Sequence, residues 1–261
     1  MTLELRPASA FSLGELAALF NAGYEDYFVP FRIDAAALGA MNGAFDVDVE
    51  ASRVALLDGE RVGFANLARR GAEAWIGGVG VVAAARRQGV AEALMRALHD
   101  EARSRDVTTV WLEVMEQNEA AYRLYEKLGY DVVRDVEVWT LESHSGGGSA
   151  REVAADRAHT RIKELRASRE PWQRADATLA HYDDLLGLAT DGGAAVFRVG
   201  AAVQLLQIAG AETDRNELVQ TLRAPGTVSV LNVPTDDPLA GTLRELGANA
   251  VVRQHEMVLT L

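Results

Sequence analysis

Apolar and polar residues along positions 1–142 follow two alternating patterns. A period of two predicts strands, and apolar residues spaced three and four apart predict amphipathic helices. The expected strands are Leu3–Arg6, Val54–Leu57, Val62–Ala68, Ala74–Val82, Val110–Met115, Val132–Val133 and Val136–Leu141. One helix is expected to begin at the Ser12–Glu15 capping box. Three more are expected at Asp34–Met41, Gly89–Ser104 and Asn118–Leu128. This mixture predicts an α/β (α+β) fold class.

The second half of the chain ends in a similar order of elements. Strands are expected at Ala194–Val199, Val203–Ile208, Val228–Val233 and Val251–Leu261, and helices at Glu212–Arg223 and after Asp237, with a mixed-charge helix within Glu152–Arg169. A shift of 118 positions brings Val110 onto Val228 and Gly129 onto Gly247. The pattern favours a duplicated fold, with chance similarity of two strand–helix–strand units as the alternative.

A segment rich in glycine and serine, Ser143–Ser149, lies between the two halves. Such composition is typical of a flexible linker. The expected domains are therefore residues 1–142 and 151–261, joined by a linker at 143–150.

Composition narrows the class of protein. The 261 residues contain no cysteine, which excludes disulfides, thiolate metal sites and a cysteine nucleophile. No apolar run reaches the roughly 18 residues of a membrane span, and the charged N-terminus does not resemble a signal peptide. These features predict a soluble, cytoplasmic protein.

The net charge is −12, of which residues 1–142 carry −9. This sign disfavours nucleic acid and anionic membranes as partners. It weakly favours a cationic partner, although an acidic surface also simply maintains solubility. The five histidines show no metal-binding spacing, so no metal is expected, and His99 is expected on a solvated helix face.

The most informative segment is Val79–Ala91, where a strand leads through a turn into a helix. A helix N-terminus presents unpaired backbone N–H groups that suit a phosphate. Two ligands are compatible with it. Gly78–Ala83 fits the dinucleotide fingerprint G-x-G-x-x-A, which requires a helix beginning there. The alternation through Val79 and Val81 instead indicates one continuing strand, and then the ligand is an acyl-CoA.

Two motifs support the second interpretation. Arg86–Ala91, Arg-Arg-Gln-Gly-Val-Ala, resembles the R/Q-x-x-G-x-G/A loop of the GNAT superfamily of N-acetyltransferases. Asn118–Tyr130 resembles that superfamily's N-x-x-A-x-x-L-Y-x-x-x-G-F/Y motif, and the two occur in the family's order. The resemblance covers about residues 1–142. Ala83 departs from it, since many members have proline there.

The resemblance implies a mixed, mostly antiparallel sheet with helices on both faces and two central strands, here Ala74–Val82 and Val110–Met115, that splay apart around acetyl-CoA. The backbone of Val79 and Val81 would then pair with pantetheine, and Asn118 would contact the CoA arm. The pyrophosphate would be held by the turn, with Arg86 adding charge to the amides of Arg87, Gln88, Gly89, Val90 and Ala91.

The resemblance also implies catalytic roles. Tyr125 matches the family's general acid, although a tyrosine at that helix position also suits a core. Glu113 is the candidate base, with Glu73 and Glu25 as rivals. The acceptor amine is expected to bind near Glu25, Tyr27, Phe28, Phe31 and Trp75. The aromatic residues among these also suit core packing.

The expected function is direct transfer of an acetyl group from acetyl-CoA to a small-molecule or peptide amine. The alternative is a non-catalytic acyl-CoA-binding sensor or interaction module. In the second half the 118 shift places Leu243 at the position of Tyr125 and Leu231 at that of Glu113. It is therefore expected to be a degenerate GNAT-like domain without a phosphate loop. The chain is expected to be a pseudo-dimeric monomer or a homodimer.

Overall fold

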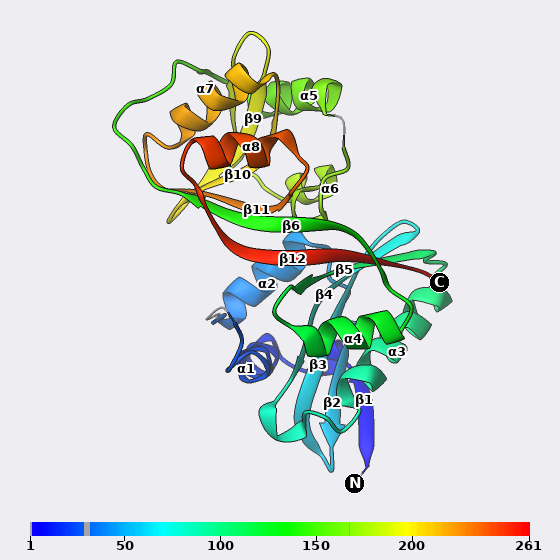
Figure 1. Cartoon of the computed structure of the whole chain (residues 1–261). Helices are drawn as coiled ribbons and strands as arrows, with labels where there is room; N and C mark the ends of the chain where they lie inside the picture. Colours follow the sequence, from blue (N-terminus) through cyan, green and yellow to red (C-terminus); the bar gives the residue numbers. More distant parts are fainter. Residues whose placement is uncertain (1, 29–31, 167) are drawn as a thin grey trace. The chain divides into compact units, whose positions relative to one another are not determined.

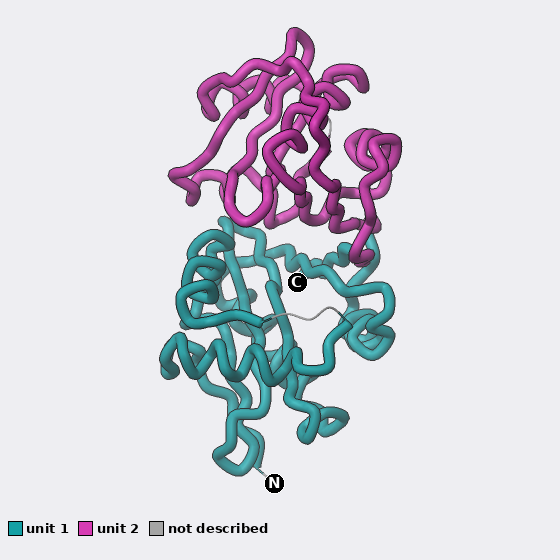
Figure 2. The backbone as a smooth tube through the Cα atoms, turned by 90° about the vertical axis from the view of Figure 1, so that its left-hand side faces the viewer, with its two compact units in different colours: residues 1–133, 256–261 teal, residues 134–255 magenta. Residues whose placement is uncertain are grey.

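The chain forms two units, shown in separate colours in Figure 2. The structure, a computed structural model, describes residues 2–28, 32–166 and 168–261. Unit 1 contains residues 1–133 and 256–261, and unit 2 contains residues 134–255.

The division differs in two places from the boundaries expected from the sequence. Residues 134–142 group with unit 2 and residues 256–261 group with unit 1. The cause is that two long strands, β6 (Asp131–Leu141) and β12 (Asn249–Thr260), each begin in one unit and end in the other. The last residues of the chain therefore belong to the sheet of unit 1, where the Leu261 amide donates to the Thr108 carbonyl over 3.0 Å.

The sheet of unit 1 has five strands of its own, followed by the end of β12. They are β1 (Leu3–Pro7), β2 (Arg53–Leu57), β3 (Glu60–Arg70), β4 (Glu73–Val81) and β5 (Thr109–Met115), in that spatial order (Figure 1). The pairs from β1 to β4 are antiparallel, whereas β4 and β5 are parallel. The mixed, mostly antiparallel sheet expected from the sequence is confirmed.

Helices cover both faces of this sheet. They are α1 (Leu13–Gly23), α2 (Ala35–Ala44), α3 (Val90–Ser104) and α4 (Glu119–Lys127), with short 3₁₀ turns η1 (Ala8–Ala10) and η2 (Ala83–Ala85). One core joins α3 and α4 to β4 and β5, and a second joins α1 and α2 to β2 and β3. The Ser12–Glu15 capping box begins α1 as expected, and Asp34 caps α2.

Unit 2 follows the same plan. Its strands, in spatial order, are β6, β11 (Val228–Pro234), β10 (Val203–Ala209), β9 (Ala194–Val199), β8 (Leu186–Ala189) and β7 (Arg151–Val153). Its helices are α5 (Ala155–Leu165), η3 (Trp172–Arg174), α6 (Asp176–Leu179), α7 (Glu212–Leu222) and α8 (Pro238–Glu245). One core contains α7 and α8, and another contains α5. The short elements β7, β8, η3 and α6 lie outside the sequence prediction.

The register of the strands supports the duplication. The parallel pairing of β4 with β5 ends at Ile76 and Leu112, and that of β10 with β11 ends at Leu205 and Val230. Leu112 and Val230 are 118 positions apart. Each inner strand has its bulge one residue later, at Gly77 in β4 and at Leu206 in β10. Two units that share a bulge at the same step of the same ladder have one topology, as the repeat predicts.

The glycine- and serine-rich segment is exposed from residue 143 to residue 147, and its end lies beside α7. The Ala150 amide donates to the Thr221 hydroxyl over 3.3 Å, and Ser149 bonds Glu217 over 2.5 Å. A Cβ on Gly148 would stand 2.3 Å from the Glu217 carbonyl oxygen. Position 148 therefore requires a glycine, because the chain passes close to α7 there. Composition alone does not show this requirement.

Candidate functional site

Strands β4 and β5 are paired over only part of their length and then diverge. Their paired register covers Glu73–Ile76 and Thr109–Leu112, yet β4 continues to Val81 and β5 to Met115. We call this region the strand divergence of unit 1. Glu113 is the first residue of β5 beyond the paired register. The splayed central strands expected from the sequence are confirmed.

The backbone of β4 presents hydrogen-bonding groups to this divergence. The Val82 amide donates to the Val62 carbonyl over 2.9 Å. Hydrogen-bonded and non-hydrogen-bonded pairs alternate in an antiparallel ladder, so the pairs that contain Val79 and Val81 are of the non-hydrogen-bonded kind. Their N–H and C=O groups therefore point away from β3, toward β5.

The glycines of β4 allow close packing against its other neighbours. A Cβ on Gly80 would lie 2.3 Å from the Phe64 ring, and one on Gly78 would lie 3.2 Å from the Tyr24 hydroxyl. The strand runs without interruption to Val81, and α3 begins only at Val90. The dinucleotide interpretation, which needs a helix directly after Gly78–Ala83, is therefore wrong.

Beyond β4 the chain forms an exposed turn that ends at the N-terminus of α3. Gly89 occupies the N-cap position with φ of 79°, a left-handed conformation that glycine adopts without strain, and no side chain caps this helix end. Arg87 also has a positive φ, of 61°. The amides from Arg87 to Ala91 thus lie at a helix start, where backbone N–H groups suit an anion.

The side chains of this turn differ in what they contact. Arg86 donates from Nε to the Val81 carbonyl over 3.0 Å and from Nη2 to the Gly23 carbonyl over 3.3 Å, so it ties the end of β4 to the end of α1. Gln88 donates to the Ala84 carbonyl over 2.9 Å. Val90 is buried in the core. The charge of Arg86 is thus held beside the strand divergence.

Helix α4 carries the second motif. Its N-cap Asn118 accepts a hydrogen bond from the Ala121 amide over 3.2 Å. Tyr125 is 8% exposed and packs against the core beneath the sheet. Burial, with a further contribution from nearby Tyr27, raises the pKa of the Tyr125 hydroxyl well above its usual range. The hydroxyl therefore remains protonated at neutral pH and can donate a proton or a hydrogen bond.

Glu113 is held by an aromatic side chain. The Trp75 indole donates from Nε1 to Glu113 Oε2 over 2.7 Å, and the Phe45 ring packs edge-on against Trp75 with centroids 5.6 Å apart. The alternating burial along β5 places Glu113 on the face opposite the core residues Leu112 and Val114, as expected. Trp75 itself is only 6% exposed, so it positions a carboxylate rather than offering an open aromatic face.

The segment after α1 lies beside the same divergence. Tyr24 packs against Phe20 with ring centroids 4.7 Å apart, and its hydroxyl lies next to β4, 3.2 Å from where a Cβ on Gly78 would stand. Tyr27 packs edge-on against Tyr24 and contacts the Asn118 side chain, while Phe28 is 53% exposed. Glu25 and, at the far end of β4, Glu73 are exposed. Phe31 lies outside the described residues.

The sequence pattern did not predict the surroundings of two residues, His99 and Tyr24. His99, expected on a solvated face, is 4% exposed and its Nε2 lies 2.9 Å from the Tyr130 hydroxyl. That expectation was wrong because His99 lies on the buried face of α3, where it meets Tyr130, the residue before β6. Burial lowers the pKa of His99 to about 4. The position of Tyr24 beside Gly78 also has no local sequence signal, since it joins positions 54 residues apart.

Unit 2 has the corresponding divergence, but it is filled. After Leu205 and Val230 the Arg174 side chain, 2% exposed, donates from Nε to the Leu206 carbonyl over 2.7 Å and pairs with Glu170 at 3.1 Å. Its element η3 packs on β11. Only residues 210–211 join β10 to α7, where unit 1 has residues 82–89 between β4 and α3. The turn that would bind a phosphate is missing.

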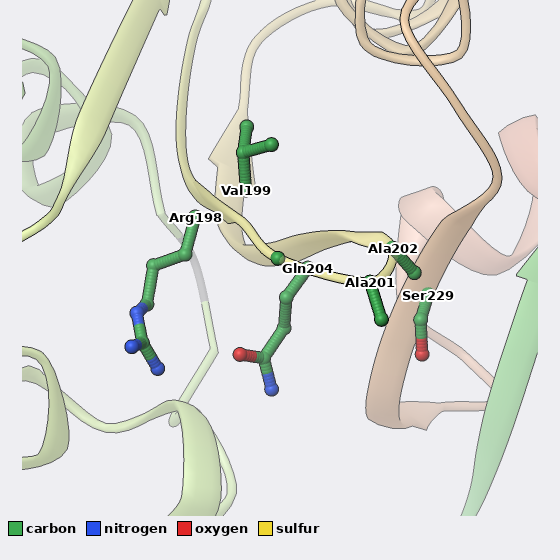
Figure 3. Close-up of a pocket in the computed structure, with 7 residues that line it drawn as sticks. Arg198, Val199, Ala201, Ala202, Gln204 and Ser229 are labelled. Atoms are coloured by element: carbon green, nitrogen blue, oxygen red, sulfur yellow. The ribbon is translucent and has the colours of Figure 1, made fainter.

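A hollow of about 300 Å³ lies elsewhere in unit 2, at the turn between β9 and β10 (Figure 3). It is lined by Arg198, Val199, Gly200, Ala201, Ala202, Gln204 and Ser229. Arg198 is already engaged, with two hydrogen bonds to Asp184 and its guanidinium over the Tyr182 ring. The hollow therefore offers mainly neutral groups and does not adjoin the divergence filled by Arg174.

In the described parts of the chain, no group of three or more His, Cys, Asp or Glu side chains has the arrangement of a metal site. No helix there is long and apolar enough to cross a membrane.

Comparison with known proteins agrees with this architecture. Residues 16–130 match the model of the acetyltransferase (GNAT) family. The [ribosomal protein bS18]-alanine N-acetyltransferase of Escherichia coli is 51% identical over 45 residues, which are 17% of this chain and 30% of that relative. The chain thus matches less than a third of this curated relative's length.

Solved structures resemble the chain over nearly its whole length. A GCN5-related N-acetyltransferase from Sphaerobacter thermophilus superimposes with a TM-score of 0.73 at 17% identity, covering 99% of this chain and 95% of that one. A tandem GNAT protein from the clavulanic acid biosynthesis pathway gives 0.66 at 16% identity, covering 99% and 98%. The expected fold of two GNAT-like domains is confirmed.

Proposed function

We propose that unit 1, whose residues 16–130 form a GNAT-family domain, transfers an acetyl group from acetyl-CoA to an amine. The proposal rests on the strand β4, whose Val79 and Val81 backbone groups face the strand divergence and which leads through a turn to the uncapped helix start at Gly89. It rests also on Tyr125, which is buried near Tyr27 and keeps its proton at neutral pH. A CoA pyrophosphate would bind at the helix start, and pantetheine would pair with β4 like an added strand.

The chemistry is a direct transfer. The lone pair of a neutral amine attacks the thioester carbonyl carbon, the new C–N bond forms, and the C–S bond breaks. The departing thiolate takes a proton from the Tyr125 hydroxyl, and the amine nitrogen loses its proton to a base. The absence of cysteine from the chain fits a route without a thioester on the protein.

We assign the base role to Glu113. Its carboxylate lies at the opening of the divergence and is held by the Trp75 indole over 2.7 Å. Glu73 lies in the paired part of β4, away from the opening, and Glu25 is exposed. A positioned carboxylate is a better proton acceptor than a mobile one, because its orientation toward the amine is set before the reaction.

The acceptor side is assigned to the segment that follows α1, with Glu25, Tyr27 and Phe28. The Tyr27 contact with Asn118 brings this segment to the loop between β5 and α4. The acceptor is a small-molecule or peptide amine. The similarity to an alanine N-acetyltransferase of a ribosomal protein favours a peptide N-terminus.

The test combines binding with turnover. Calorimetry with CoA should give one site per chain, because unit 2 lacks the phosphate-binding turn. Radiolabelled acetyl-CoA incubated with peptide N-termini, polyamines, amino acids and antibiotic amines should label at least one class. CoA binding without transfer to any amine would favour the sensor interpretation, and no CoA binding would refute both.

A further inference from the structure

Strand β1 has an unpaired edge. It is the end strand of the unit 1 sheet (Figure 1), and among the described residues no strand pairs with it on the side away from β2. Leu5 packs against the core, whereas the side chains of Glu4 and Arg6 are 51% and 49% exposed. The exposed edge of an end strand is a template for pairing with another chain.

The pairing of β1 with β2 shows which backbone groups lie on this edge. The Asp58 amide donates to the Thr2 carbonyl over 3.0 Å. Farther along the strand, the Ala8 amide donates to the Ser52 carbonyl, also over 3.0 Å. Hydrogen-bonded pairs alternate along an antiparallel ladder, so the even-numbered residues of β1 bond to β2. The odd-numbered residues, with Leu5 at their centre, therefore point their N–H and C=O groups toward the unpaired edge.

The charges of β1 are complementary to a second, antiparallel copy of the same strand. When Leu5 lies opposite Leu5 of the other copy, Glu4 of each chain lies opposite Arg6 of the other. Since only odd-numbered residues have outward groups, the neighbouring registers are shifted by two residues. They would place Glu4 opposite Glu4, or Arg6 opposite Arg6. Opposite charges across a ladder are stabilising and like charges are destabilising, so the charges select one register.

The contact between these residues within one chain is compatible with that register. Arg6 donates to both carboxylate oxygens of Glu4, from Nε over 2.6 Å and from Nη2 over 2.9 Å. Two such pairs running in opposite directions would form a cluster in which the four charges alternate in sign. Pro7 has no N–H to offer to the edge, so the ladder ends there. The edge is therefore short and is fully used by one partner.

We propose that β1 is a dimerisation edge, which pairs with β1 of a second copy of this chain about a two-fold axis at Leu5. The two Leu5 residues exchange two backbone hydrogen bonds, and a Glu4–Arg6 contact between chains lies on each side of them. An interface of this kind is closed, because each copy uses the same surface. The proposal does not depend on the proposed function, since it uses no residue of the strand divergence.

The test is sedimentation velocity of the full chain over a wide range of protein concentration. The wild type is expected to form a dimer that dissociates on dilution. Glu4→Arg and Arg6→Glu should each raise the dissociation constant about tenfold, because each variant sets like charges opposite each other twice. An equimolar mixture of the two variants should dimerise as the wild type does, since every charge then faces its opposite. The double variant with both substitutions should also recover the wild-type constant.

The matched control is Arg151→Glu, which reverses a charge on β7, the end strand of unit 2, and should leave the dimer unchanged. A wild type that stays monomeric at every concentration would refute the proposal. A dimer that neither Glu4→Arg nor Arg6→Glu weakens would also refute it, because β1 would then lie outside the interface. Recovery in the mixture shows that the single variants are folded. CoA binding by a monomeric wild type would leave the proposed function standing.

Discussion

The two strand divergences share a ladder and a bulge, but different side chains contact the inner strand in each. In unit 1 two side chains reach the inner strand. Tyr24 is a neutral phenol whose hydroxyl lies beside Gly78, and Arg86 is an exposed guanidinium that donates to the Val81 carbonyl. In unit 2 the side chain that reaches the inner strand is Arg174, a buried guanidinium that bonds the Leu206 carbonyl and pairs with Glu170. A hydrogen bond from an exposed guanidinium can be exchanged for one to a ligand, whereas a buried ion pair cannot be opened without leaving a charge uncompensated.

The difference continues after the inner strand. Unit 1 has a turn with Gly89 at a helix start, and unit 2 joins β10 to α7 through residues 210–211. One topology therefore supports a site in one unit and a closed core in the other. We propose that the second domain, expected from the sequence to be degenerate, has a structural role for this reason.

The largest expected effect is on the stability of unit 2, whose divergence is filled by Arg174. Arg174→Met should lower the free energy of unfolding by about 3–5 kcal/mol, because it leaves Glu170 buried without its partner. Urea denaturation measures this, and adding Glu170→Gln should recover part of the loss. A loss below about 1 kcal/mol would show that Arg174 is not what closes unit 2. CoA stoichiometry should remain one per chain, since the phosphate-binding turn is still missing.

The next largest effect is on the rate of acetyl transfer at the strand divergence of unit 1. Tyr125→Phe should lower kcat on the order of 100-fold, because the thiolate then leaves without a proton donor. The dissociation constant of CoA, measured by calorimetry, should stay at the wild-type value. Leu243, at the corresponding position of unit 2, makes Leu243→Ile a control that leaves the rate unchanged. Equal turnover by wild type and Tyr125→Phe would contradict the acid role.

A third difference is acid sensitivity. His99 is buried in unit 1 with its pKa lowered to about 4, while the buried face of α7 in unit 2 consists of Leu218, Val219 and Leu222, none of which titrates. The unfolded chain binds a proton at His99 below its ordinary pKa, and the folded chain does so only near pH 4. Stability is therefore complete above pH 6.5 and decreases as the pH falls toward 4, by about 3 kcal/mol.

The measurement compares wild type with His99→Gln by urea denaturation at pH 7.5 and 4.5. The variant has no group at this position that titrates between these values, so it should lose less stability on acidification than the wild type. Equal losses in the two proteins would show that His99 is not the acid-sensitive group of unit 1.

The smallest effect concerns the base. Glu113→Gln should lower kcat/KM about tenfold near neutral pH and less at high pH, where the amine is already neutral. A pH–rate profile of the variant measures this. The Trp75 indole can still donate to the amide oxygen of the glutamine, so the packing is conserved. An equal loss at every pH would argue against the base role and leave Glu25 and Glu73 as alternatives.

Local sequence patterns predict much of the fold. The alternation along β5 predicts which side chains are buried, and the sequence Asp237-Pro238 predicts the start of α8, whose cap is present as expected. Gly129 and Gly247 end corresponding helices with positive φ in both units. The motif around Arg86–Ala91 predicts the turn and helix start. These features depend on a few neighbouring residues, so one sequence suffices to predict them.

The sequence by itself therefore determined most strands and helices of both halves, the turn before α3 that is proposed to bind a phosphate, and the candidate acid and base. Only the tertiary structure decided that the last six residues complete unit 1, that His99 is buried, and which side chain reaches each divergence. Tyr24 and Gly78 are 54 positions apart, and Arg174 and Leu206 are 32 apart. Their placement depends on how helices stack on a sheet, and no periodicity or cap along the chain records that stacking.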